Sequence, residues 1–173
     1  MANWKQPEEG TFIPYQKTYF DLVPAGDLVD LITNQFNDTE TLLLRLSDDQ
    51  AGHAYATGKW TIKEVINHLV DCERIMCYRA LCIARGEQTS LPGFEQDDYV
   101  TASGANERSM KDLVNEFRTV RQASISLLKT FDDATLARMG VANNHPVSVN
   151  ALCHVIAGHE LHHMKIIRER YLL

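Results

Sequence analysis

Four stretches of the chain repeat apolar residues every three or four positions, which is the pattern of a helix that buries one face. In the third stretch, this stripe includes Met110, Leu113, Val114 and Phe117. We find no competing run of alternating apolar and polar residues that would favour a strand. The pattern therefore predicts an all-α fold, a four-helix bundle. The predicted helices cover residues 26–46, 61–85, 109–131 and 148–171.

Individual residues mark where some of these helices begin and end. The Thr61 hydroxyl can accept from the backbone N–H of Glu64 while the Glu64 carboxylate reaches back, which is a capping box. Gly86 supplies a stop after the second helix, and Ser148 is a good N-cap for the fourth. These signals define the second helix at both ends and the fourth at its start.

The segments outside the helices are expected to be irregular. Residues 1–23 are rich in aromatic residues but have no helical period, so we expect an extended arm over the bundle, and residues 48–58 are expected to be a loop. Residues 86–108 form a connection of about twenty residues, a length that is uncommon within a compact domain and often functional. Such a crossover frees the third helix from lying antiparallel to the second. We expect residues 1–173 to form a single domain.

Charge and composition exclude several classes of function. The chain carries 17 Lys and Arg against 23 Asp and Glu, a formal net charge of −6. This balance argues against nucleic-acid and membrane partners, because both are bound largely through Lys and Arg. The polar N-terminus is unlike a signal peptide, no apolar run is long enough to span a membrane, and the four cysteines include no C-x-x-C pair. We therefore expect a cytoplasmic protein with reduced thiols.

Two of the seven histidines share the buried face of the fourth predicted helix. His159 and His163 are four residues apart, so their imidazoles lie one turn apart and can reach a single ion. A chain of 173 residues needs no metal to fold, so a metal would serve chemistry. The spacing therefore predicts two ligands of a metal site.

Other residues near these positions leave alternatives open. His68 lies on the flank of the second helix, where it is permitted as a third ligand, and Cys72, one turn further on, is an alternative or additional ligand. His53 and His145 fall in loops and His154 faces away from the apolar stripe of its helix, so we expect these three to be solvated.

The fourth helix also contains the H-E-x-x-H signature of zinc metalloproteases, which spans His159 to His163. Only ten residues follow His163, so the downstream ligand that such proteases need is missing. We therefore disfavour peptidase activity.

Two carboxylates lie close to the centre of their apolar stripes, namely Glu160 and Glu73. A buried carboxylate must be paired, accept a hydrogen bond from a ligand imidazole, or act as a base. A salt bridge to Arg79 or Arg168 is an equally good interpretation of each.

Three motifs in this order resemble the DinB-like (YfiT-like) superfamily. They are the run from Gly58 to Arg74, the crossover Leu91-Pro92-Gly93-Phe94 and the run from Ala157 to His163. The resemblance covers nearly the whole chain, and it implies up-down-down-up topology and, in many members, a homodimer. It further implies a divalent metal, commonly nickel or zinc, held by His68, His159 and His163.

The resemblance favours two enzymatic functions, and we weigh a non-catalytic one beside them. The first is a thiol-dependent S-transferase of the bacillithiol type, in which the metal activates a low-molecular-weight thiol and Glu160 or Asp71 orients an imidazole or acts as a base. The second is a hydrolase that uses a metal-activated water, and the third is a metal-binding stress-response protein without turnover. Both enzymes would act on a small-molecule substrate.

Overall fold

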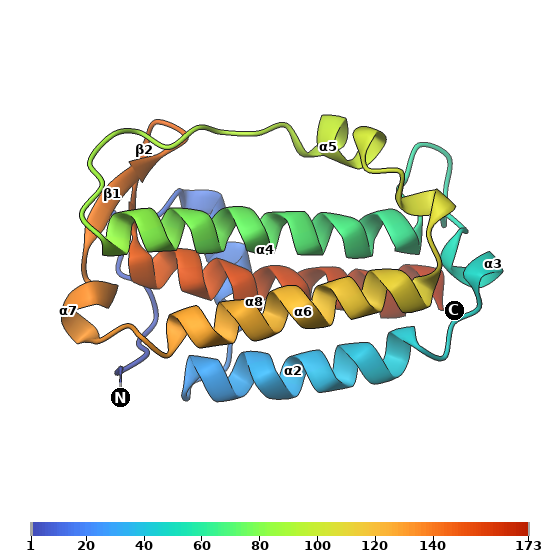
Figure 1. Ribbon diagram of the computed structural model, residues 1–173, viewed down its shortest axis with the longest axis horizontal. Coiled ribbons are helices and arrows are strands. Elements are labelled where there is room, and N and C mark those ends of the chain that lie inside the picture. Colours follow the sequence, from blue (N-terminus) through green and yellow to red (C-terminus); the bar gives the residue numbers. More distant parts are fainter. Residues whose placement is uncertain (1, 173) are drawn as a thin grey trace.

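The computed structural model describes residues 2–172 and is built on four long helices (Figure 1). Each begins within two residues of its predicted start, and the first three end within three residues of their predicted ends. The fourth ends at Ile166, and a π-helical segment, Ile167–Tyr171, continues it to the predicted end. The all-α four-helix bundle is therefore confirmed. The four helices are α2 (Leu28–Leu43), α4 (Ile62–Ala84), α6 (Met110–Leu128) and α8 (Val149–Ile166).

The helices adopt the up-down-down-up topology. α4 and α6 run in one direction, and α2 and α8 run in the other (Figure 1). α4 packs against α6 and α8, and α2 packs against the same two helices, so α2 and α4 occupy opposite corners. The crossover from α4 to α6 runs back along the length of the bundle (Figure 1), which allows these two helices to be parallel.

The helix ends follow the chemistry expected from the sequence. Thr61 Oγ1 accepts from the Glu64 backbone N–H at 3.1 Å, and Glu64 Oε2 accepts from the Thr61 N–H at 2.7 Å. Ser148 caps α8 by accepting from the Ala151 N–H at 3.0 Å. Gly86 has φ of 95°, a left-handed conformation that suits glycine after a helix.

The core consists of two apolar clusters with polar residues between them. One cluster includes Phe20, Ile83 and Leu152, and the other includes Phe36 and Phe117. The intervening level of the bundle contains buried Glu73, Arg121, His159 and Glu160. The bundle therefore carries its polar side chains in one layer near its middle.

Several short elements lie outside the predicted helices, and they make the expectation of wholly irregular connections wrong. A helical segment from Pro14 to Phe20 interrupts the arm, which is therefore not extended throughout. Elements this short show no periodic stripe in the sequence. The others are α3 (Asp48–Ala51), α5 (Gln96–Ala102), a 3-10 turn (Ala105–Glu107) and α7 (Asp133–Leu136).

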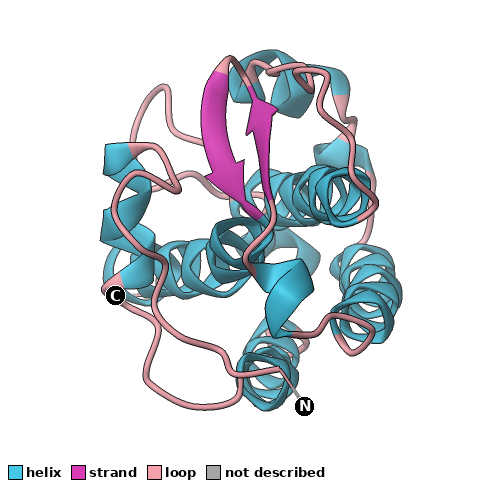
Figure 2. Cartoon of the chain, turned by 90° about the vertical axis from the view of Figure 1, so that its left-hand side faces the viewer, coloured by secondary structure: helices cyan, strands magenta, loops and turns pink. Residues whose placement is uncertain are grey.

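A two-stranded hairpin of β1 (Met139–Ala142) and β2 (His145–Ser148) closes one end of the bundle (Figure 2). Asn143 and Asn144 form its turn with φ of 50° and 61°, which is the type I′ geometry of tight hairpins. The Leu91 N–H donates to Val141 O at 2.9 Å and the Ser148 N–H donates to Thr11 O at 2.9 Å. The hairpin is therefore bonded to the crossover through one strand and to the arm through the other.

The arm contacts α8 directly at Gly158. A Cβ at this position would lie 2.4 Å from Tyr19 O, so only glycine allows the short helix α1 (Lys17–Phe20) to approach so closely. Within residues 2–172, no helix is long and apolar enough to cross a membrane.

Candidate metal centre

Three imidazoles converge in the polar layer of the bundle. His159 Nε2 lies 3.1 Å from His68 Nε2 and 3.0 Å from His163 Nε2. The rings of His68 and His163 are 5.1 Å apart between centroids. The structure thus brings together the three histidines that the family resemblance implied.

The surrounding elements hold these rings in place. His159 and His163 lie one turn apart on α8, and His68 faces them from α4. The Trp60 ring lies 4.8 Å from that of His68, and the Tyr171 hydroxyl donates to Trp60 O at 2.7 Å. The end of the chain therefore helps to fix the wall behind His68.

The three imidazoles are neutral at physiological pH. Burial lowers the pKa of His68 to about 4, against a smaller opposing effect of Asp97. Burial also lowers the pKa of His163 to about 3, and burial together with the neighbouring imidazoles holds the pKa of His159 well below its usual range. Neutral imidazole is the form that binds metals.

The two nitrogen spacings at His159 suit a first-row divalent ion. An ion about 2.0–2.1 Å from each nitrogen holds adjacent nitrogens about 2.9–3.4 Å apart, from octahedral to tetrahedral geometry. The two distances from His159, 3.1 and 3.0 Å, lie in that range. Three nitrogen ligands also leave coordination positions free, as in catalytic sites.

Cys72 offers a further donor at the same place. Its Sγ lies 3.6 Å from His68 Nδ1 and 3.7 Å from His68 Nε2, and one ligand atom from each of His68, Cys72 and His159 falls within 4.8 Å of the others. Burial raises the pKa of the Cys72 thiol to about 12, so without a cation it stays protonated. His68, Cys72 and His159 therefore form one compact donor set, and His163 adjoins it through His159.

Glu160 faces away from the imidazoles and into a buried ion-pair network. Its Oε2 accepts from Arg121 Nη2 at 2.8 Å and from Gln35 Nε2 at 2.6 Å, and its Oε1 accepts from Thr39 Oγ1 at 2.6 Å. Arg121 also binds Glu73, with 2.8 Å between Nη2 and Oε2. The salt-bridge interpretation is thus the one that the contacts support, but the partner is Arg121 from α6.

Asp71 likewise contacts no imidazole in the described part of the chain. Its Oδ2 accepts from Asn67 Nδ2 at 2.8 Å, and Arg74 lies 3.7 Å from its Oδ1. The expectation that Glu160 or Asp71 orients an imidazole is therefore not met by these contacts, because Arg121 holds one carboxylate and Asn67 the other. The carboxylate that influences the pKa of His68 is Asp97.

His154 corrects another expectation, because it is buried rather than solvated. Its Nδ1 bonds to Asn150 O at 2.9 Å, and the rings of Trp4 and Phe20 lie 6.3 and 6.1 Å away. The arm covers this side of α8, which the helical period alone could not show. His53 and His145 are exposed, as expected.

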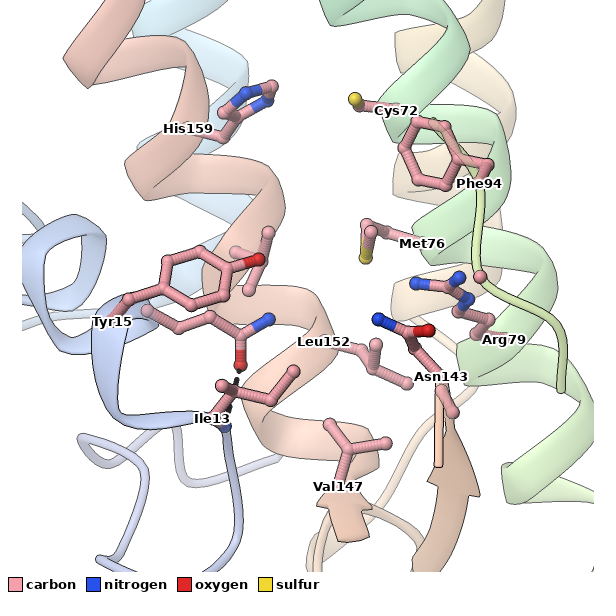
Figure 3. Close-up of a pocket in the computed structure, with 14 residues that line it drawn as sticks. Ile13, Tyr15, Cys72, Met76, Arg79, Phe94, Asn143, Val147, Leu152 and His159 are labelled. Atoms are coloured by element: carbon pink, nitrogen blue, oxygen red, sulfur yellow. Dashed lines mark hydrogen bonds between the residues drawn. The ribbon is translucent and has the colours of Figure 1, made fainter. Parts of the chain in front are cut away.

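A cavity of about 140 Å³ lies beside the candidate centre, and His159 and Cys72 line it. Figure 3 shows His159 and Cys72 at one end of the cavity, and Arg79 and Asn143 further along it. The walls come from the arm, α4, the crossover, the hairpin and α8. The candidate metal centre is thus open to a pocket.

Four polar residues of this pocket were not predicted as site residues, namely Tyr15, Gln16, Arg79 and Asn143. Tyr15 and Asn143 lie in segments without helical periodicity, and Arg79 was interpreted as a partner of a buried glutamate. An Asn-Asn pair favours a turn with two left-handed residues, so it was the available signal for the hairpin. Nothing comparable marks Tyr15.

Sequence comparison decides the family. The profile described as the DinB superfamily matches residues 31–167. The chain belongs to the DinB superfamily. A DinB-like relative, a putative metal-dependent hydrolase of Oceanobacillus iheyensis, is 24% identical over 160 residues, which cover 90% of this chain and 88% of the relative.

Solved structures agree with this DinB-like fold. YfiT from Bacillus subtilis, a probable metal-dependent hydrolase with an unusual four-helix bundle topology, superposes with a TM-score of 0.70 and 15% identity, covering 95% of this chain and 90% of YfiT. The mycothiol-dependent maleylpyruvate isomerase superposes with a TM-score of 0.62 and 12% identity, covering 83% of this chain and 61% of the isomerase. At these identities, the two structures support the fold alone.

Proposed function

We propose that this DinB-like protein is a metal-dependent hydrolase that holds a divalent ion through His68, His159 and His163. The observation that carries the proposal is the convergence of neutral His68 and His163 imidazoles on His159, which lines an open pocket. Neutral imidazole ligands suit zinc, nickel and other late first-row ions, so we propose zinc or nickel as the native metal.

A bound ion supplies a Lewis acid that polarises a substrate carbonyl and lowers the pKa of a water in its open position. The protein supplies the placement. Two helices hold the three nitrogens, the side chains of Trp60 and Tyr19 pack against the rings of His68 and His159, and burial keeps all three imidazoles neutral. Burial also raises the pKa of Tyr15, so its hydroxyl is a neutral hydrogen-bond donor at the pocket wall.

The pocket and the relatives favour hydrolysis. The pocket has a volume of about 140 Å³, well below the roughly 300–1,000 Å³ of pockets that hold drug-sized ligands. It therefore suits one small substrate better than a substrate together with a thiol cofactor. The relative from Oceanobacillus iheyensis and YfiT both carry the name of metal-dependent hydrolase. The open pocket disfavours a purely metal-storing protein, which would enclose its ion.

A thiol-dependent S-transferase is the second candidate. The likeness to a mycothiol-dependent isomerase supports it, because thiol-dependent chemistry occurs on the same fold. The two functions differ in one requirement, since only the transferase needs a thiol.

The test is turnover by the full chain loaded with zinc or nickel. We expect hydrolysis of p-nitrophenyl esters of short carboxylic acids without thiol, and its loss in His159→Ala. His162→Ala is the matched control, because this neighbouring histidine is outside the converging set, and it should retain activity. Activity that requires an added low-molecular-weight thiol would replace the hydrolase with the transferase. A tightly bound ion without turnover under either condition would favour the non-catalytic protein.

A further inference from the structure

The pocket contains a buried cation that no carboxylate neutralises within residues 2–172. Arg79 is only 7% exposed, and its Nη2 donates to Pro92 O at 2.6 Å. Its guanidinium carbon lies 5.8 Å from the centre of the Phe94 ring. Arg79 lines the pocket, and Figure 3 shows the end of its guanidinium pointing into the cavity.

A second buried arginine in the same bundle shows what a structural guanidinium looks like here. Arg121 is 1% exposed and bonds to two carboxylates, those of Glu73 and Glu160. Arg79 instead contacts the Pro92 carbonyl and the Phe94 ring. Burying a charge without a counter-ion is costly. This contrast indicates that the missing anion of Arg79 comes from a ligand.

The neighbours of Arg79 complete a polar end of the pocket. The side chain of Asn143 approaches it from the hairpin (Figure 3), and a Cβ at Gly93 would come within 2.3 Å of Asn143 Oδ1. Glycine at 93 therefore leaves room for this amide beside the guanidinium. The Tyr15 hydroxyl points into the same cavity from the arm (Figure 3).

The pocket also sets the length of the ligand. Cys72, Met76 and Arg79 lie on one face of α4, and from Cys72 to Arg79 the helix rises about 10 Å. Met76, Leu152 and Val155 form apolar walls along the way. A ligand that reaches from Arg79 to the histidines therefore has a polar end, a short apolar middle and a reacting end.

We propose that Arg79 selects substrates that carry a carboxylate, joined by a short apolar linker to the bond that is cleaved at the histidine end. A planar carboxylate matches the two parallel N–H donors of a guanidinium. This inference rests on the proposed function for the reacting end, whereas the anion site itself needs no metal.

The test measures binding to the full chain after metal has been chelated, so that a carboxylate cannot bind to an ion. The probes are pentanoate and its neutral analogue pentanamide, followed by chemical-shift titration. We expect pentanoate to bind at least tenfold more tightly than pentanamide. Arg79→Met should remove this preference, and Arg74→Met, a change on the same helix at an arginine paired with Glu116, should leave it unchanged.

Equal binding of acid and amide by the wild-type chain would overturn the proposal, and this comparison needs no variant that might fail to fold. Retention of the preference in folded Arg79→Met would also overturn it. Inorganic phosphate binding as tightly as pentanoate would overturn the assignment to a carboxylate. If the metal-loaded wild-type protein hydrolyses nothing but still prefers pentanoate to pentanamide, the proposed function is refuted and the anion site is not.

Discussion

Replacing Arg121 by methionine is expected to destabilise the bundle severely, because Arg121 neutralises two buried carboxylates. Its Nε donates to Glu73 Oε1 at 2.9 Å, and its Nη2 lies 2.8 Å from oxygens of both Glu73 and Glu160. Its Nη1 donates to Ile32 O at 2.9 Å. Burial acts to lower the pKa of Arg121, but the two carboxylates outweigh it and raise this pKa above its usual range.

The magnitude follows from what the substitution leaves behind. Hydrogen bonds to charged groups contribute about 1.5–3 kcal/mol each, and removal of one partner from a buried ion pair costs about 3–5 kcal/mol. We therefore expect Arg121→Met to lower the free energy of unfolding by about 3–5 kcal/mol at pH 7.

Urea unfolding followed by circular dichroism measures this change. Arg118→Met is the matched control on the same helix, because Arg118 pairs with Glu40 at a partly exposed position and such pairs contribute about 1 kcal/mol or less. Arg121→Lys keeps the positive charge but loses the planar guanidinium that bonds both carboxylates at once. Its loss of unfolding free energy should therefore lie between the losses in Arg121→Met and Arg118→Met. A loss below about 1 kcal/mol for Arg121→Met would refute the argument that this network neutralises Glu160.

Three smaller perturbations test other parts of the account. Gly158→Ala places a Cβ 2.4 Å from Tyr19 O and should cost about 1–3 kcal/mol in thermal unfolding, whereas an unchanged melting temperature would mean that the arm is not packed on α8. Thr61→Ala removes the cap of α4 and should cost about 1 kcal/mol in urea unfolding; no loss would show that the capping box contributes nothing. Burial lowers the pKa of His154, so below pH 6.5 the unfolded chain binds a proton that the folded chain does not. The free energy of unfolding therefore falls with decreasing pH, by up to about 1.4 kcal/mol per pH unit. His154→Gln should flatten this pH dependence, and an identical slope would contradict it.

The long helices were predictable because their signals are local. These signals depend on residues within a few positions of one another. They are the apolar stripe of each helix, the reciprocal hydrogen bonds of Thr61 and Glu64, and the helix-ending glycine at position 86. The hairpin and the short helical segments were missed because elements of three to seven residues are too short to show a clear period.

The candidate site was predictable only in part, because its partners come from different helices. His159 and His163 share a helix face, so the sequence paired them, whereas His68 joined them through the family resemblance. The partner of Glu160 lies on α6, and nothing near Glu160 in the chain indicates Arg121 over Arg79 or Arg168. The burial of His154 depends on Trp4 and Phe20 of the arm, which no helical wheel includes.

Metal stoichiometry tests the central claim most directly. The full chain, loaded with zinc or nickel and freed of excess ion, should contain one ion per chain by elemental analysis. His68→Ala, His159→Ala and His163→Ala should each lose it, and His162→Ala should keep it. A wild-type chain that binds no ion, or a folded His159→Ala variant that retains a full equivalent, would contradict the three-histidine centre.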